Sequence, residues 1–122
     1  MKGIKKMPNS QILLEMATLA KKGKDFDFYL VMHTNDHEPA HLHVYLSKEN
    51  IKTDDYFTRL IIPSMMPTNI NDLQTLNGEH DNPLPSKSKQ QILKWFLQVD
   101  KEENISNYSF AKKLWAIYKN TD

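Results

Sequence analysis

The chain has 122 residues, no cysteine and a formal net charge of +1 at neutral pH, and 39% of its residues are hydrophobic. This length suits one hydrophobic core, so we predict a single domain over residues 1–122. The absence of cysteine excludes disulfides and thiolate metal sites. No apolar run reaches the roughly 20 residues of a membrane helix, and no apolar signal stretch follows the basic N-terminus. We therefore expect a cytoplasmic protein with no membrane association.

The N-terminal segment predicts a helix. Apolar side chains recur at helical spacing over residues 9–22. Asn9 or Ser10 can cap this helix, and Gly23 follows two lysines as a stop signal. Residues 1–24 contain six lysines and one acidic residue. We interpret this charge as the solvated face of the helix rather than as a phosphate-binding surface.

Three strands follow the predicted helix. Apolar side chains alternate with other side chains over residues 25–33 and again over 41–47, which is the period of a β-strand. The polar segment 34–40 has turn-forming residues and predicts the loop of a hairpin. A polar turn over 48–55 leads to a third strand over 56–62.

The second half of the chain predicts an irregular excursion and two helices. Residues 63–85 are rich in proline and asparagine, with a short strand expected near 70–76. Ser86 begins a helix with apolar residues at positions i, i+3, i+4 and i+7, and a final helix spans about 107–118. The predicted architecture is α+β: an N-terminal helix, a three-stranded antiparallel sheet and two C-terminal helices packed on one sheet face.

Four of the five histidines lie in the eleven residues from His33 to His43. The strand alternation decides which sheet face each side chain occupies. The side chains expected to face the helices are Leu30, Met32, Leu42, Val44 and Leu46. Those expected on the opposite face are Tyr29, His33, His41, His43, Tyr45 and Arg59. In this hairpin His33 lies opposite or nearly opposite His41, with Asp36 and His37 above them in the loop.

Histidines from neighbouring strands can surround a tetrahedral Zn²⁺ ion. We predict a metal site whose core ligands are His37, His41 and His43. We expect His33 or His80 to assist these core ligands. The candidates for a fourth ligand, or for a group that orients the ligands, are Asp36, Glu38 and His80. Imidazole also binds nickel, copper and iron, so the expected cofactor is Zn²⁺ or another divalent transition metal. A metal with an open coordination position would support hydrolysis, whereas a metal with all positions filled by protein would stabilise the fold of an interaction module.

Two other functions remain open from the residues alone. The histidines could act as acid and base in a toxin-like ribonuclease, with Tyr29, Tyr45 and Arg59 facing the phosphodiester. The chain could also be a non-catalytic inhibitor of a host defence complex, carried by a phage. The leading hypothesis is a metal-binding interaction or regulatory module with a protein partner, and nucleic acid is the alternative partner.

The segment Asn35-Asp36-His37-Glu38-Pro39-Ala40-His41-Leu42-His43-Val44 resembles a family of small bacterial and phage proteins. That family is domain of unknown function 4160, with the core pattern Asp-His-x-Pro-Pro-His-Phe-His-Val. The resemblance continues at Leu84-Pro85 and in the helix after it, and covers about half of the chain. Its members often lie beside small partner genes, as toxin–antitoxin pairs do. The matching positions are His37, Pro39, His41 and His43, whereas Ala40 and Leu42 depart from the pattern. The predicted order of elements also resembles the double-stranded-RNA-binding-like fold of small mRNA-cleaving toxins.

Overall fold

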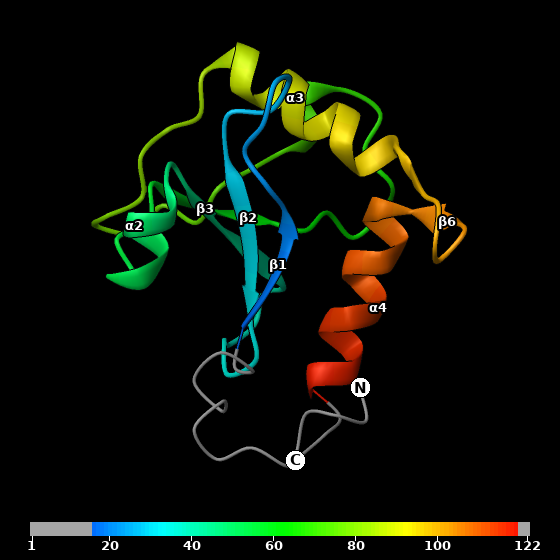
Figure 1. The fold of residues 1–122 in the computed structure, drawn as a ribbon, viewed down its shortest axis with the longest axis horizontal. Helices are drawn as coiled ribbons and strands as arrows, with labels where there is room; N and C mark the ends of the chain where they lie inside the picture. The colour runs from blue at the N-terminus through cyan, green and yellow to red at the C-terminus, as the bar shows by residue number, and fades with distance from the viewer. Residues whose placement is uncertain (1–15, 120–122) are drawn as a thin grey trace.

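A four-stranded antiparallel sheet forms the centre of the protein, in the order β1–β2–β3–β4 (Figure 1). The structure is a computed structural model that describes residues 16–119. The strands of the sheet are β1 (Met16–Ala20), β2 (Tyr29–His33), β3 (His41–Tyr45) and β4 (Thr58–Ile61). Each strand pairs with the next one along the chain, so short connections suffice.

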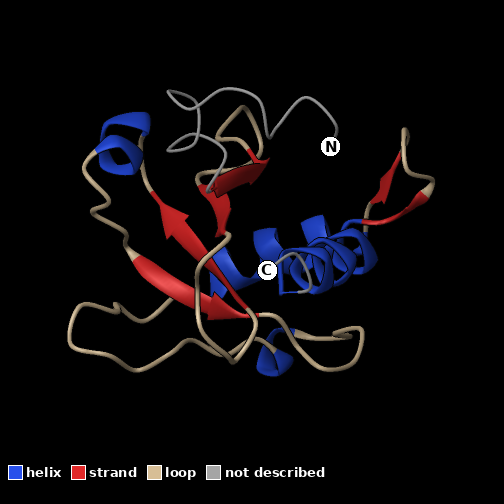
Figure 2. Ribbon diagram, turned by 90° about the horizontal axis from the view of Figure 1, so that it is seen from below, coloured by secondary structure: helices blue, strands red, loops and turns tan. Residues whose placement is uncertain are grey.

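Two longer helices follow the sheet. They are α3 (Ser86–Leu97) and α4 (Asn107–Lys119), and between them lies a second, two-stranded sheet of β5 (Val99–Asp100) and β6 (Ile105–Ser106) (Figure 2). The short helix α2 (Lys48–Lys52) and the 3₁₀ helix η3 (Ile70–Asp72) lie in the connections on either side of β4. None of the helices within residues 16–119 is long and apolar enough to cross a membrane.

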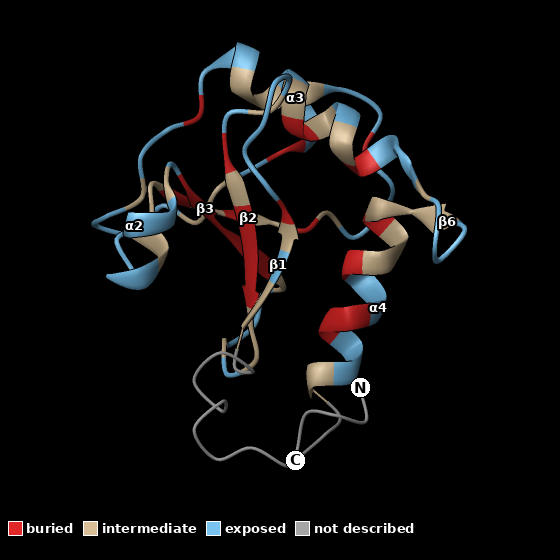
Figure 3. Cartoon of the chain, viewed as in Figure 1, coloured by how far each residue is buried: buried red, intermediate tan, exposed pale blue. Residues whose placement is uncertain are grey.

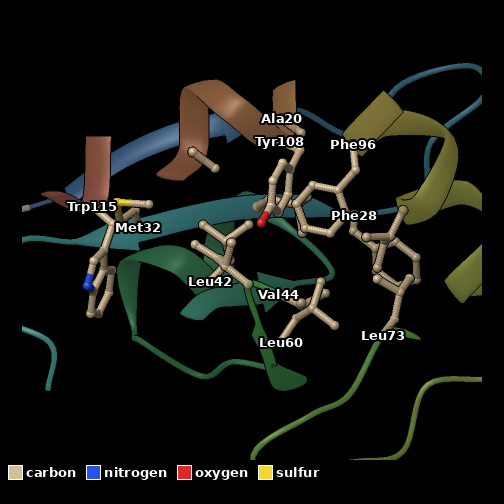
Figure 4. Close-up of a cluster of buried hydrophobic side chains, with 14 of the residues drawn as sticks. Ala20, Phe28, Met32, Leu42, Val44, Leu60, Leu73, Phe96, Tyr108 and Trp115 are labelled. Carbon is tan, nitrogen blue, oxygen red and sulfur yellow. The ribbon is translucent and has the colours of Figure 1, made fainter. Parts of the chain in front are cut away.

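The hydrophobic core lies between one face of the four-stranded sheet and helices α3 and α4 (Figure 4). Alternate residues of the strands supply one side of it, because successive side chains of a strand point to opposite faces. The buried strand residues are Leu30, Met32, Leu42, Val44 and Leu60, and the helices contribute Ile92, Phe96, Tyr108, Ala111, Leu114 and Trp115. Figure 3 shows that buried residues run along β2 and β3, whereas α2 has none.

The prediction of an α+β fold is confirmed, as are the two C-terminal helices. The predicted N-terminal helix is wrong where the structure describes it, because Met16–Ala20 form strand β1. Without β1, strand β2 would be an edge strand with unpaired backbone groups, and pairing with β2 outweighs the helix propensity of this segment. Residues 9–15 of that predicted helix lie outside the described residues.

The prediction of three strands is therefore wrong too, and the sheet has four. Other boundaries also differ from the sequence prediction. The predicted turn at 48–55 contains helix α2, which Ser47 caps by accepting a hydrogen bond from the backbone N–H of Asn50. The strand expected near 70–76 is a 3₁₀ helix followed by a single bridge between Leu60 and Thr75. Strand β3 ends at Tyr45, so Leu46 is 41% exposed instead of buried.

Candidate metal centre

The histidine-bearing face of β2 and β3 is covered by loops. His41 and His43 are only 4% and 7% exposed. Asp36 from the 34–40 loop approaches both rings, and the Tyr56 ring packs edge-on against His43 with 5.0 Å between the ring centroids. The register pairs Val31 with His43, and its continuation places His33 opposite His41. The hairpin thus collects these histidines in a largely dehydrated space.

Asp36, His41 and His43 form a group that could hold a metal ion. Asp36 Oδ2 lies 3.3 Å from His41 Nε2 and 3.5 Å from His43 Nδ1. One ligand atom from each of the three residues lies within 4.8 Å of the other two. Asp36 Oδ2 and His43 Nδ1 are also buried without a hydrogen-bond partner. Buried polar atoms left in this way cost free energy unless a cation or a proton occupies the space between them.

A hydrogen bond fixes the orientation of the His41 ring. Its Nδ1 lies 2.7 Å from the carbonyl oxygen of Pro39. Because a carbonyl oxygen only accepts, Nδ1 carries the proton, and a neutral ring then has its lone pair on Nε2. In this neutral form of the ring the lone pair faces the Asp36 carboxylate, and two acceptors, Nε2 and Asp36 Oδ2, meet at 3.3 Å. An imidazole that donates its second N–H to a backbone carbonyl is typical of metal-ligating histidines.

The charges of the group suit a metal site. Burial lowers the pKa of His43 to about 4, and repulsion from a positive charge on His33 contributes to this shift. Burial opposes ionisation of Asp36, but the contact with His41 and the positive charges of the neighbouring histidines outweigh it, so the pKa of Asp36 is lowered. Near neutral pH the space is therefore lined by a carboxylate and by a neutral His43 imidazole.

A second group that could hold a metal ion consists of His33, His43 and Asp54. It shares His43 with the first group, but its other members have hydrogen-bond partners. The Tyr45 hydroxyl donates to Asp54 Oδ1 at 2.5 Å. Since that hydroxyl has one proton, His33 Nε2–H donates to the Tyr45 oxygen at 3.1 Å. Burial raises the pKa of Tyr45, and the hydrogen bond to Asp54 raises it further, so the phenol stays protonated.

A cleft of about 380 Å³ opens beside the first group. Asp36 and His41 lie in its wall, and Arg59, Asn77 and Gly78 contribute to the wall as well. Arg59 donates from Nε to Asp81 Oδ1 at 3.1 Å and from Nη2 to Asp81 Oδ2 at 2.8 Å. Much of the hydrogen-bonding capacity of this guanidinium is thus directed to Asp81 and not to the cleft.

The structure brings together five of the residues predicted for the site. They are His33, Asp36, His41, His43 and Tyr45. His37 is exposed, lines the cleft and belongs to neither group, and His80 is exposed in a separate depression beside Asp54 and Tyr56.

Two further candidates lie at the margin of the site. Tyr29 pairs with Tyr45 at the far end of the hairpin, and Glu38 Oε2 accepts from the indole N–H of Trp115 at 3.2 Å. Sequence reasoning missed Asp54, which it assigned to an ordinary polar turn. The only signal for Asp54 was a carboxylate between two strands, which is too common to identify a ligand.

We compared the chain with protein-family models, with curated proteins and with solved structures. None of the three comparisons found a match. The resemblance to domain of unknown function 4160 therefore stays a prediction, and the candidate site depends on its own geometry.

Proposed function

We propose that this protein binds one divalent transition-metal ion, with zinc the best fit, through Asp36, His41 and His43. The observation that carries this proposal is the convergence of two unpartnered buried atoms and one oriented imidazole nitrogen on the same small space. Two imidazoles and one carboxylate are a ligand set that zinc accepts readily. The two candidate groups share His43, but only this one also contains the unpartnered oxygen of Asp36, whereas His33 and Asp54 are already hydrogen-bonded.

The geometry favours a metal centre with one open coordination position rather than a structural site closed by four protein ligands. Structural zinc sites are closed by four protein ligands, whereas catalytic sites use three and leave a position for water or substrate. Three ligands beside a cleft of about 380 Å³ fit the second arrangement. When bound there, the metal would supply a Lewis acid that activates water, the chemistry of a hydrolase. The hydrogen-bonded chain of His33, Tyr45 and Asp54 lies next to His43 and would hold its ring in place.

Metal analysis of untagged protein tests this proposal. We expect about one equivalent of zinc per chain and a melting temperature that falls when a chelator removes it, because binding to the folded state adds to its stability. Asp36→Asn and His41→Gln should each weaken zinc binding tenfold or more. His37→Ala is the matched control, since it removes an exposed histidine from the same loop and should leave binding intact. A wild-type protein with neither bound metal nor a thermal shift in added zinc would refute the proposal.

A second pair of variants separates the two candidate groups. Asp54→Asn changes the group that contains His33 but leaves the first group untouched. Zinc affinity within about threefold of wild type is expected for Asp54→Asn, against a loss of tenfold or more for Asp36→Asn. The reverse order of effects would assign the metal to His33, His43 and Asp54.

The ribonuclease alternative makes a different prediction. Acid–base catalysis by histidines needs no metal, so RNA cleavage would survive EDTA and would show a bell-shaped pH dependence. A hydrolase that depends on this centre would lose its activity in EDTA and regain it with zinc. Cleavage that persists in EDTA and disappears in His43→Ala would favour the ribonuclease.

A further inference from the structure

A second cleft lies between the turn that joins β1 to β2 and helix α3. Its volume is about 860 Å³, and it shares no lining residue with the cleft at the metal centre. Four lysines line it: Lys21 and Lys24 from the β1–β2 connection, and Lys87 and Lys94 from α3. All four are exposed. The chain thus brings together positive charges that are 63 or more positions apart between the two elements.

The four lysines have no ion-pair partner among residues 16–119. Two acidic residues, Asp25 and Asp27, also line the cleft. Asp27 is engaged with Gln91, whose Nε2 donates to Asp27 Oδ2 at 3.0 Å and whose Oε1 accepts from the Asp27 backbone N–H at 3.2 Å. The lysines therefore outnumber the acids, and an anion would relieve their mutual repulsion.

The start of α3 adds positive potential close to Lys87. The residue before the helix is Pro85, which makes no side-chain hydrogen bond to the first turn. The N-terminus of a twelve-residue helix carries a partial positive charge and backbone N–H groups that favour anions. This feature strengthens the field of the lysines but is not itself the site.

Aromatic side chains distinguish this cleft from a merely basic surface. Phe26 and Trp95 line it, and both are partly buried against the hydrophobic core, which limits their motion. Gln90 and Gln98 add amide donors and acceptors to the same wall. Proteins that bind single-stranded nucleic acid combine lysines along the phosphate backbone with aromatic rings on which the bases stack.

We propose that this cleft binds single-stranded nucleic acid, with the four lysines contacting phosphates and a base stacking on Trp95. The proposal is independent of the metal centre. It also changes the interpretation of the N-terminal lysines: Lys21 and Lys24 follow a strand and face a cleft, so they are not the solvated face of a helix.

Fluorescence anisotropy with labelled ten-nucleotide DNA and RNA strands tests the proposal. We expect binding that weakens as salt rises, with a slope of log K against log salt near −3, since each contacted phosphate contributes about −0.7 for single strands. Lys21→Ala combined with Lys94→Ala should weaken binding at least tenfold and reduce the slope by about 1.4. The Trp95→Phe variant should bind several-fold more weakly, since a smaller ring stacks less well.

The control is a double variant with the same change in net charge. Lys52→Ala with Lys113→Ala removes two lysines that are paired with Glu49 and Glu103 and lie outside the cleft, and should change affinity less than twofold. Equal losses in the two double variants would overturn the proposal, because they would show a response to net charge alone. It would also be overturned by the absence of binding at low salt, or by equally tight binding of poly-glutamate of the same length.

Discussion

Asp36 and Arg59 are two charged residues of the same region with opposite environments. The carboxylate of Asp36 has a buried oxygen without a hydrogen-bond partner, whereas Arg59 donates three hydrogen bonds to one carboxylate, that of Asp81. Asp81 is 1% exposed at its side chain and also accepts from the Gly78 backbone N–H at 2.7 Å. The Arg59–Asp81 pair is thus a satisfied structural element, and Asp36 is the residue that a cation would stabilise.

Gly78 permits the close approach of the Arg59–Asp81 pair. A Cβ atom at this position would lie 2.5 Å from Arg59 Nη2 and 2.8 Å from Asp81 Oδ2. Gly78→Ala should therefore push the pair apart and destabilise the protein by about 1–3 kcal/mol in urea unfolding. Gly23→Ala is the control, because a Cβ there meets nothing within 4 Å. Equal stability of the two variants would show that the pair can shift at no cost.

Asp81 also predicts a pH dependence of stability. Burial opposes ionisation of Asp81, but the hydrogen bonds from Arg59 and Gly78 outweigh it, so its pKa lies below the ordinary value of 3.8. A carboxyl with a lowered pKa in the folded state stabilises the protein fully above its unfolded pKa, and this stabilisation is lost as pH falls through the folded value. The free energy of unfolding should therefore fall below about pH 4 more steeply in wild type than in Asp81→Asn. Parallel pH profiles for the two proteins would contradict this assignment.

At the scale of secondary-structure elements, the spacing of apolar residues predicted the helices and strands that have a regular core-facing side. The alternation over β2 and β3 and the apolar spacing of α3 and α4 mark the face of each element that packs in the hydrophobic core, so these elements could be predicted. Strand β1 could not, because its alanines and leucine also suit a helix, and only pairing with β2 makes it a strand.

The candidate site, like the fold, could be predicted only in part. Alternation placed His41 and His43 on one face. The choice of Asp36 over His37 depends on how the 34–40 loop folds back, and no periodic pattern records such a loop.

The end of β3 gives a direct test of this assignment of faces. Leu42 is fully buried in the core, whereas Leu46, which the alternation predicts to be buried, lies beyond the strand and is 41% exposed. Leu42→Ala should cost about 2–5 kcal/mol of unfolding free energy, because it removes buried apolar volume. Leu46→Ala should stay within about 0.5 kcal/mol of wild type. Similar losses in both variants would mean that the strand continues through Leu46.

At the scale of the whole molecule, the two clefts lie at opposite ends of β2. The lysine-lined cleft involves residues just before Tyr29, whereas the metal centre involves Asp36 in the loop that follows His33. A strand of five residues separates the two ends by about 17 Å. Its residues Leu30 and Met32 are packed in the core. Figure 1 shows the turn before β2 and the loop after it at the two ends of this strand.

This separation predicts that the two sites act independently. Oligonucleotide affinity measured with and without EDTA should agree within about twofold, because neither ligand has different contacts in the presence of the other. The reciprocal measurement, zinc affinity with saturating oligonucleotide, should agree equally well. A tenfold change in either direction would reveal coupling and would mean that the nucleic acid reaches the metal centre.

The central claim is that Asp36, His41 and His43 hold a metal ion, and anomalous diffraction at the zinc absorption edge tests it most directly. In crystals of untagged protein grown with zinc, we expect one strong anomalous peak about 2.0–2.2 Å from a carboxylate oxygen of Asp36, from His41 Nε2 and from His43 Nδ1. A peak bound by His33 and Asp54, or by His37, or the absence of any peak between Asp36 and the two histidines in saturating zinc, would contradict the account.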